Sequence, residues 1–380
     1  MKKQLLTRCS IVLPDKVVEQ CALLIEDGCI AAIEPSGTKE VREIDMAGAF
    51  VLPGMIDLHC DALEKEIEPR PNVLFPMDFA ISQADRRNAQ AGITTVFHAL
   101  SFAHGELGVR NRETAAMIAR QVRSYNHGLI DNRVHGRYEI TDEESLVVMS
   151  GLIEEGALDF VSVMDHTPGQ GQFKDLSAYR DYLENTYKKS AREAEALIER
   201  KITNGKDALK RVECLAATAG EHGIRMASHD DDSTERVHAM ANLGGTVSEF
   251  PVNFEAAKAA FHHGLWTIFG APNILRGGSQ NGSMKALDAV RKNVARCLCS
   301  DYHPGTLLAA VFQLPRLAEI DLAGAVRLVT ANPAAAAGYK NRGTIEESKR
   351  ADLIAVRFKG EMPSVSHLWV NGELKYQEGS

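Results

Sequence analysis

The chain has 380 residues, of which 44% are hydrophobic and 25% are charged, and its formal net charge is -8. This composition is that of an ordinary globular protein, long enough for one large α/β domain with an appendage. The negative charge argues against a nucleic-acid-binding protein, because binding to a phosphate backbone requires clustered Lys and Arg. No apolar run approaches the roughly 20 residues of a membrane span, and Arg8 interrupts the apolar segment near the start. We therefore expect no membrane association and a cytoplasmic location.

The seven cysteines are an odd number spread over a long chain, and a single residue separates Cys297 from Cys299. This pattern does not suggest a disulfide framework. We expect free thiols in a reducing compartment.

The two ends of the chain have the pattern of short strands joined by turns. The N-terminal strands are expected at residues 4–8, 21–26, 29–33 and 41–45, and the C-terminal strands at residues 351–356, 365–370 and 373–376. The pairs Asp27-Gly28 and Asn371-Gly372 are typical hairpin turns. We predict that residues 1–52 and 340–380 together form one small β-sandwich domain.

In the middle of the chain, residues 53–339, strand-like runs alternate with helical stretches. The runs are the segment that ends at Asp61 and residues 92–100, 132–140, 160–165, 225–229, 246–251, 266–271 and 297–301. Such alternation predicts a parallel sheet, and about eight strands favour a closed, TIM-like (β/α)8 barrel over an open sheet. In this fold, functional side chains gather at the C-terminal ends of the strands.

Residues 176–222 depart from this alternation, because they have helical periodicity throughout, with a break at Asn204-Gly205. We interpret them as a helical hairpin inserted into a βα connection. Its first arm carries Tyr and basic residues that suit either a lid over an anionic substrate or a solvated or subunit-contacting helix face, and the second interpretation is favoured. These residues are Tyr179, Tyr182, Tyr187, Lys188, Lys189 and Arg192.

The first barrel strand ends in a possible metal-binding pair. Residues 53–61 read Pro-Gly-Met-Ile-Asp-Leu-His-Cys-Asp. Alternate residues of a strand point the same way, so His59 and Asp61 can converge on one ion while Cys60 faces away. Such a pair can equally be solvated or hydrogen-bonded internally, so the interpretation depends on the other strand ends.

Other predicted strand ends also carry groups that bind a metal or move a proton, namely His98, Glu139, His166, His229, Glu249, Asp301 and His303. Divalent ions such as zinc or manganese prefer imidazole and carboxylate ligands, and a two-metal site adds a bridging carboxylate. We predict a centre of one or two ions, with zinc expected before manganese. The predicted ligands are His59, Asp61, Glu139, His166, His229 and Asp301.

Individual members of this set have different expected roles. Glu139 is the best candidate for the bridging carboxylate, although it can instead support a ligand without touching the metal. His166 and His229 are expected to hold the second ion, and Asp301 is expected to ligate and to accept a proton from bound water as the catalytic residue. Outside the set, His98 can be a hydrogen-bonded core histidine, and residues 230–232 can form an acidic loop or a helix cap.

These motifs, in this order and with β-rich termini, resemble the amidohydrolase superfamily over essentially the whole chain. Most members carry His at both positions of the first pair, whereas this chain has Asp61. Five segments resemble one branch, the triphosphate diphosphatases of the bacterial carbon–phosphorus lyase pathway of phosphonate utilisation. They are residues 62–71, 135–139, 165–172, 228–232 and 270–279. The resemblance implies metal-dependent hydrolysis of α-D-ribose 1-methylphosphonate 5-triphosphate to the 5-phosphate and diphosphate.

A leaving diphosphate needs cationic and donor groups. Residues 273–283 offer glycines, whose backbone N–H groups can approach phosphate oxygens, together with Arg276 and Ser279. The alternative interpretation is a flexible loop with a surface arginine. Further candidates for substrate binding are Lys65, Arg70 and Arg137.

Two other functions stay open. The same fold can hydrolyse a cyclic amide, an N-acyl amino acid or a base, although Asp61 and the Arg276 segment speak against these substrates. The chain can also be a non-catalytic subunit of a phosphonate-pathway complex, although the full set of predicted ligands speaks against that role. The expected partners are a small phosphorylated sugar as substrate and a second copy of the chain in a homodimer.

Overall fold

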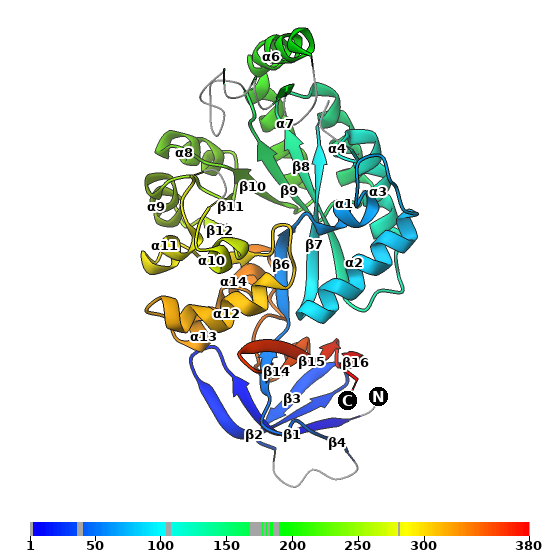
Figure 1. Ribbon diagram of the computed structural model, residues 1–380, viewed down its shortest axis with the longest axis vertical. Coiled ribbons are helices and arrows are strands. Elements are labelled where there is room, and N and C mark those ends of the chain that lie inside the picture. Colours follow the sequence, from blue (N-terminus) through cyan, green and yellow to red (C-terminus); the bar gives the residue numbers. More distant parts are fainter. Residues whose placement is uncertain are drawn as a thin grey trace.

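The computed structural model describes residues 3–35, 41–103, 108–167, 190–279 and 282–379, together with residues 177, 180, 183 and 184. Two eight-stranded sheets form its framework. One is parallel and curls into a nearly closed barrel surrounded by helices, and the other lies at one end of the barrel and combines strands from both ends of the chain (Figure 1).

The barrel strands follow one another in sequence order around the sheet. They are β6 (Met55–Cys60), β7 (Ile93–Phe102), β8 (Asp131–Glu139), β9 (Phe160–Met164), β10 (Arg225–His229), β11 (Val247–Glu249), β12 (Trp266–Gly270) and β13 (Cys297–Cys299). A parallel bridge between Cys60 and Asp301 brings the end of the last strand against the first. The predicted (β/α)8 barrel is therefore confirmed, and every barrel run predicted from the sequence overlaps one of these strands.

Helices connect the strands and cover the barrel. They are α1 (Ala62–Ile67), α2 (Met77–Ala91), α3 (Arg112–Ser124), α4 (Glu143–Glu154), α7 (Ala208–Glu221), α8 (Thr234–Asn242), α9 (Phe254–His262), α10 (Pro272–Arg276), α11 (Ala286–Arg291), α12 (Thr306–Leu317), α13 (Leu322–Arg327) and α14 (Ala331–Ala336). Side-chain caps start several of them, as where Asn111 accepts a hydrogen bond from Thr114 N (2.9 Å) at α3. Gly92 ends α2 with a φ of 89°, a left-handed conformation that favours glycine.

The barrel strands are largely buried, because strands that are covered by helices have no face exposed to water. All of β7 is buried. Apolar side chains from most of the barrel strands, among them Ile56, Phe97, Phe160 and Ile268, join in one cluster with residues of α14. This packing holds the strands rigidly and so fixes the positions of the side chains at their C-terminal ends.

The second sheet is predominantly antiparallel and contains both termini. Its strands are β1 (Gln4–Val12), β2 (Val17–Glu26), β3 (Cys29–Ile33), β4 (Arg42–Asp45), β5 (Phe50–Pro53), β14 (Leu353–Lys359), β15 (Met362–Val370) and β16 (Glu373–Gln377). β5 pairs with both β1 and β14, which joins the N-terminal strands to the C-terminal strands. The predicted small β domain from both termini is confirmed, while the boundaries at residues 52 and 340 stay predictions.

The predicted helical insertion is only partly within the described residues. α6 (Ala191–Gly205) begins at a capping box between Ser190 and Glu193 and projects beyond the barrel at the top of Figure 1. α7 contacts α4 and β10, so it belongs to the helices that cover the barrel. Most of the first arm, including Tyr179, Tyr182 and Tyr187, lies outside the described residues, so neither interpretation of this arm is tested. The extent of the insertion, residues 176–222, stays a prediction.

Two further observations concern the chain as a whole. All seven cysteines are free thiols. Among the described helices, none has the length and the apolar character needed to cross a bilayer.

Candidate metal centre

The ends of β6 and β13 lie side by side and present two carboxylates to the same space. The Asp61 N–H donates to the Asp301 carbonyl (2.6 Å), and the Asp301 N–H donates to the His59 carbonyl (3.0 Å). Ligand atoms of His59, Asp61 and Asp301 lie within 4.8 Å of one another. The pair predicted from the first strand therefore converges, and Asp301 joins it from the last strand.

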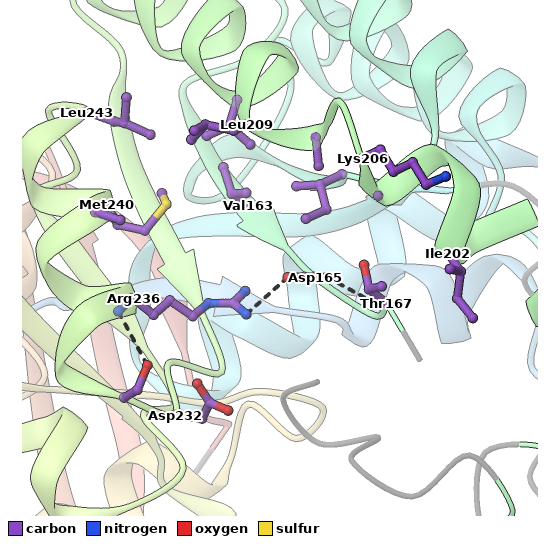
Figure 2. Close-up of a pocket in the computed structure, with 16 residues that line it drawn as sticks. Val163, Asp165, Thr167, Ile202, Lys206, Leu209, Asp232, Arg236, Met240 and Leu243 are labelled. Atoms are coloured by element: carbon purple, nitrogen blue, oxygen red, sulfur yellow. Dashed lines mark hydrogen bonds and ion pairs between the residues drawn. The ribbon is translucent and has the colours of Figure 1, made fainter. Parts of the chain in front are cut away.

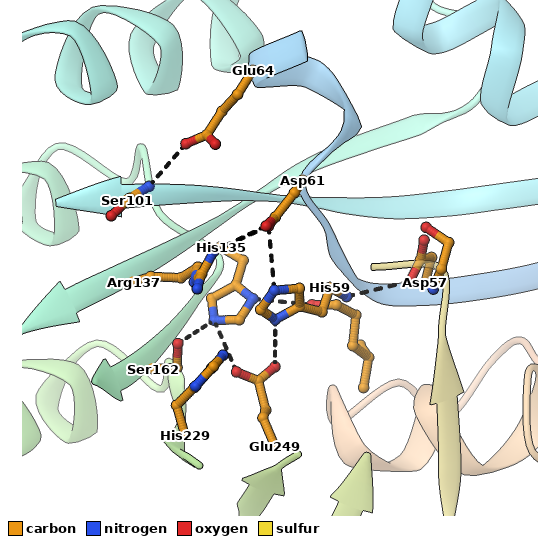
Figure 3. Close-up of polar contacts among 12 residues, drawn as sticks. Asp57, His59, Asp61, Glu64, Ser101, His135, Arg137, Ser162, His229 and Glu249 are labelled. Carbon is orange, nitrogen blue, oxygen red and sulfur yellow. Dashed lines mark hydrogen bonds and ion pairs between the residues drawn. The ribbon is translucent and has the colours of Figure 1, made fainter. Parts of the chain in front are cut away.

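A second group of possible ligands shares His59 with the first. Ligand atoms of His59, His229 and Glu249 also lie within 4.8 Å of one another. The Nδ1 atom of His59 is 3.1 Å from Glu249 Oε1, and its Nε2 atom is 3.3 Å from Asp61 Oδ1, as Figure 3 shows. One buried imidazole thus lies between two carboxylates, with His229 beside it.

The chemistry of these groups fits a divalent metal ion. Imidazole nitrogens and carboxylate oxygens are the ligands that zinc and similar ions accept. Both ring nitrogens of His229 and the Oε2 atom of Glu249 are buried without a hydrogen bond, although His229 Nδ1 is 3.2 Å from Asp230 Oδ2. Buried polar atoms are normally paired, so a bound ion would satisfy these atoms.

The two aspartates at this edge have opposite electrostatic environments. Burial by itself would raise the pKa of Asp61, but Arg137, His59 and Arg110 together hold it well below its usual value. Burial and the neighbouring Asp61 carboxylate raise the pKa of Asp301 above its usual value. Asp61 therefore stays ionised, whereas Asp301 is the better proton acceptor.

Glu249 and His59 stabilise each other's charged forms. Burial opposes both charges, yet the histidines around Glu249 lower its pKa to about 2. The Glu249 and Asp61 carboxylates raise the pKa of His59 to about 10 against the effect of burial. Because a metal binds the neutral imidazole, metal binding at His59 must release a proton.

Glu139 and His166 form a separate pair. His166 Nδ1 is 2.7 Å from Glu139 Oε2, and the Thr141 hydroxyl donates to Glu139 Oε1 (2.7 Å). Lys201 of α6 lies 3.8 Å from the same Glu139 carboxylate. Among the described residues, neither Glu139 nor His166 belongs to the two ligand groups around His59. Their predicted roles as metal ligands stay predictions.

The predicted substrate-binding residues lie at different depths. Arg137 is buried, and its Nη1 atom is 3.1 Å from Asp61 Oδ1. Arg276 is exposed and donates to the Tyr302 hydroxyl (3.3 Å), next to Asp301 in the chain. The segment that contains it begins as helix α10 and continues to the half-buried Ser279.

Lys65 and Arg70 are both exposed, on α1 and just after it. No contact places either side chain near the ligand groups among the described residues, so their role stays a prediction.

His135 is not among the candidates from the sequence, and Glu249 is named only as a strand-end group that can bind a metal or move a proton, not as a predicted ligand. His135 stacks edge-to-face on His59 with ring centroids 5.2 Å apart, and burial lowers its pKa to about 3. Its Nδ1 atom donates to the Leu58 carbonyl (3.0 Å). The sequence could have indicated His135, because His135, Arg137 and Glu139 are alternate residues of one strand and therefore face the same side. Glu249 could have been identified from its place at the end of a buried strand. That strand is only three residues long, which weakens its sequence pattern.

A cavity of about 890 Å³ lies between α7 and α8, and its lining does not include the residues of the two ligand groups. Figure 2 shows its apolar wall, which includes Val163, Leu209 and Met240. At its edge, Arg236 Nη1 is 3.3 Å from Asp165 Oδ2, and Asp165 precedes His166. The mainly apolar lining suits a triphosphate less well than the charged groups around Asp61 do.

Comparison with known proteins shows the family to which the chain belongs. The model of the amidohydrolase family matches residues 50–375. The chain belongs to the amidohydrolase family. This amidohydrolase is 33% identical over 369 residues to the alpha-D-ribose 1-methylphosphonate 5-triphosphate diphosphatase of Escherichia coli K12, covering 96% of the chain and 97% of that protein. The resemblance predicted from the motifs is confirmed, and the protein is a hydrolase of a superfamily whose members are generally metal-dependent.

Solved structures share the fold of this amidohydrolase. A Xaa-Pro dipeptidase with bound methionine has a TM-score of 0.67 at 15% identity, covering 99% of this chain and 100% of that one. An N-acetyl-D-glucosamine-6-phosphate deacetylase from Mycobacterium smegmatis has a TM-score of 0.64 at 15% identity, with the same coverage of 99% and 100%. At these identities the likeness concerns the fold alone.

Proposed function

We propose that this amidohydrolase hydrolyses α-D-ribose 1-methylphosphonate 5-triphosphate to the 5-phosphate and diphosphate in phosphonate catabolism. The observation that carries the proposal is the pair of guanidiniums, Arg137 and Arg110, which lie 3.1 and 3.2 Å from the Asp61 carboxylate beside the candidate metal ligands. Guanidiniums bind phosphate oxygens strongly and in a fixed geometry. The diphosphatase of Escherichia coli, similar over nearly the whole chain, supports the same substrate.

The metal requirement follows from the residues at the strand ends. A divalent ion held by His59, His229 and Glu249, with Asp61 and Asp301 at hand, would act as a Lewis acid and lower the pKa of a water molecule. We propose zinc, with manganese as the alternative. A second ion would require Glu139 and His166, and the metal content per chain distinguishes one ion from two.

Asp301 has the role of proton acceptor in this proposal. Its carboxylate lies within the same group as His59 and Asp61, so it can reach a water that the ligands hold. Its raised pKa makes it a better base than Asp61, whose pKa is lowered. Asp301 would therefore take the proton of the water that attacks the α-phosphorus.

The triphosphate needs cationic groups along its length. Arg137 is the predicted residue nearest the ligands, and we propose that it binds the phosphate under attack. Arg276 and Ser279 would hold the departing diphosphate, since the Arg276 side chain contacts Tyr302 directly after Asp301. Lys65 and Arg70 are proposed only as outer contacts, because both are exposed.

The test is a product analysis of the purified, metal-loaded protein. With the ribose triphosphate as substrate, ³¹P NMR should show diphosphate and the 5-phosphate in equal amounts. Hydrolysis of a cyclic amide or an N-acyl amino acid, measured as carboxylate or ammonia release and without action on the triphosphate, would instead establish the commoner chemistry of the superfamily. Absence of any bound metal and of any hydrolysis would favour a non-catalytic subunit. We also propose a homodimer, which light scattering of the same sample would test.

A further inference from the structure

Two carboxylates, Glu64 of helix α1 and Glu68 directly after it, accept hydrogen bonds from backbone N–H groups that precede α3. The Glu64 side chain is 4% exposed, and its Oε1 atom accepts a hydrogen bond from Ser101 N (3.2 Å). Glu68 Oε2 accepts a hydrogen bond from Val109 N (3.0 Å). Val109, directly before Arg110, is thus fixed to the residue that follows helix α1.

The Arg110 side chain is held by the same helix. Its Nε atom donates to Glu64 Oε2 (2.6 Å), and its Nη2 atom lies 3.2 Å from Asp61 Oδ2. Two charge-assisted contacts, made by different nitrogens of one guanidinium, fix its plane. The orientation of Arg110 is therefore set by a buried carboxylate that is not itself one of the candidate metal ligands.

Asp61 lies between two guanidiniums that differ in depth. Arg137 is the inner one, with its side chain 10% exposed, and Arg110 is the outer one, 35% exposed. By contrast, the side chain of Arg342, at the other end of the barrel, is only 7% exposed. The partial exposure of Arg110 leaves its guanidinium accessible to a ligand, as a binding group must be.

The Asp61 carboxylate also couples this pair to the metal centre. It belongs to a ligand group with His59 and Asp301, so an ion that draws on Asp61 competes with the guanidiniums for its charge. When a metal ion weakens the attraction between Asp61 and the two guanidiniums, the guanidiniums can bind another anion more strongly. Anion binding at Arg110 should therefore be stronger in the metal-loaded protein than in the metal-free protein.

We propose that Arg110, together with Arg137, binds the phosphate groups of a polyphosphate ester, and that Glu64 is a positioning residue for Arg110. This inference rests on the proposed function, because it names residues that recognise the same substrate. It adds to that function Arg110, which no motif in the sequence indicated, and the carboxylate that orients it.

The experiment measures binding of inorganic diphosphate by calorimetry to metal-loaded wild type, Arg110→Gln, Arg110→Lys and Glu64→Gln. Arg87→Gln is the matched control, because Arg87 is 59% exposed and pairs with Glu66 of the same helix α1 at 2.8 Å. The metal content of each sample is measured in parallel. Neither readout requires that the natural substrate be known.

Loss of a hydrogen bond to a charged group corresponds to about a tenfold or larger change in affinity. Arg110→Gln should weaken diphosphate binding by about tenfold or more and keep its metal, and Arg87→Gln should match wild type. Arg110→Lys and Glu64→Gln should fall between them in diphosphate affinity. In a separate steady-state assay with the ribose triphosphate, both variants should raise KM more than they lower kcat. Metal-free wild type should bind diphosphate more weakly than metal-loaded wild type.

Two results would overturn the inference. One is wild-type affinity for diphosphate in Arg110→Gln. The other is a parallel loss of metal in Arg110→Gln and Glu64→Gln, since Arg110 would then serve only to hold Asp61. If diphosphate binds as expected but the ribose triphosphate is not hydrolysed, the proposed function fails while the anion site stands.

Discussion

The two ends of the barrel both bury charged side chains, but they use different residue types. At the N-terminal end, Arg342 Nη1 is 2.8 Å from Asp131 Oδ2, and Arg350 Nε is 2.8 Å from Asp352 Oδ1. These pairs link the start of β8 to the segment that enters the terminal sheet. At the C-terminal end, the charges belong mainly to histidines and carboxylates, with two arginines around Asp61.

This difference separates a structural role from a chemical one. Arginine is always protonated and cannot ligate a metal, so the Arg–Asp pairs at the N-terminal end offer no group that ligates a metal or exchanges a proton. Imidazole and carboxylate can ligate metals and exchange protons. We therefore predict that substitutions at the C-terminal end of the barrel affect metal binding and turnover, and that substitutions at the N-terminal end affect stability.

The largest expected effect is the loss of a ligand at the C-terminal end. His229→Asn should remove bound metal and reduce hydrolysis to background, because both ring nitrogens of His229 are otherwise without a hydrogen bond. Elemental analysis and an activity assay check this. His238→Asn, an exposed histidine of α8, is the control and should retain both metal and activity. Full metal occupancy in His229→Asn would remove His229 from the ligand set.

Asp301→Asn tests proton transfer at the same end. General base catalysis contributes about 10²- to 10⁴-fold, so kcat should fall by that factor. Binding of a non-hydrolysable triphosphate analogue should change little, because the guanidiniums remain. A kcat within about threefold of wild type would exclude Asp301 as the proton acceptor.

Arg342→Met tests the structural end. Removing one partner of a buried ion pair costs about 3–5 kcal/mol, because the other charge is left unpaired. The side chain of Arg342 is 7% exposed and that of Asp131 is 16% exposed, so a large part of this loss is expected in urea unfolding. Metal content and kcat of the folded fraction should not change. If Arg342→Met lost metal without losing stability, the N-terminal end would not have the purely structural role that we assign to it.

Arg276→Gln should have a smaller effect. The side chain is exposed and lies at the rim beside Tyr302, so its contact with a diphosphate would be partly screened by water. We expect KM for the triphosphate to rise by about two- to tenfold with kcat nearly unchanged. Steady-state kinetics measures this, and an unchanged KM would show that the predicted phosphate loop is wrong.

The smallest effect concerns a histidine outside the metal centre. Burial lowers the pKa of His98 to about 4 from 6.5, and its ring donates to Asn132 Oδ1 (2.9 Å). The unfolded chain binds the proton more readily, so the stabilising contribution is complete above pH 6.5 and is lost as the pH falls toward 4. His98→Gln should flatten the fall of the melting temperature over this range. If the melting temperature of wild type and of His98→Gln fell equally with pH over this range, His98 would not be the source of this pH dependence.

The sequence predicted the barrel well because the pattern is local. Strands buried on both faces read as apolar runs, and alternation with helices implies a parallel sheet. The same logic selected His59, Asp61, His229 and Asp301, because each lies at the end of such a strand. The structure brings them into the two possible ligand groups, and their roles as ligands stay predictions. It also allowed for His98 as a hydrogen-bonded core histidine, which its full burial and its hydrogen bond to Asn132 confirm.

The remainder of the site depends on contacts between distant segments. Arg110 follows no strand end and has no motif, and its place beside Asp61 is set by Glu64 and by the backbone before it. Lys201 reaches Glu139 from α6, which sequence periodicity could identify as a helix but could not orient. Long side chains on loops and helix faces are positioned by tertiary packing, and a single sequence does not encode that packing in a local pattern.

The most direct test of the account is anomalous diffraction from crystals of the metal-loaded protein. We predict a peak at the C-terminal end of the barrel, about 2.0–2.2 Å from a ring nitrogen of His59 and of His229, with a carboxylate of Glu249, Asp61 or Asp301 completing the ligand set. A peak elsewhere, or none at full metal loading, would contradict the central claim that the strand ends form a metal centre.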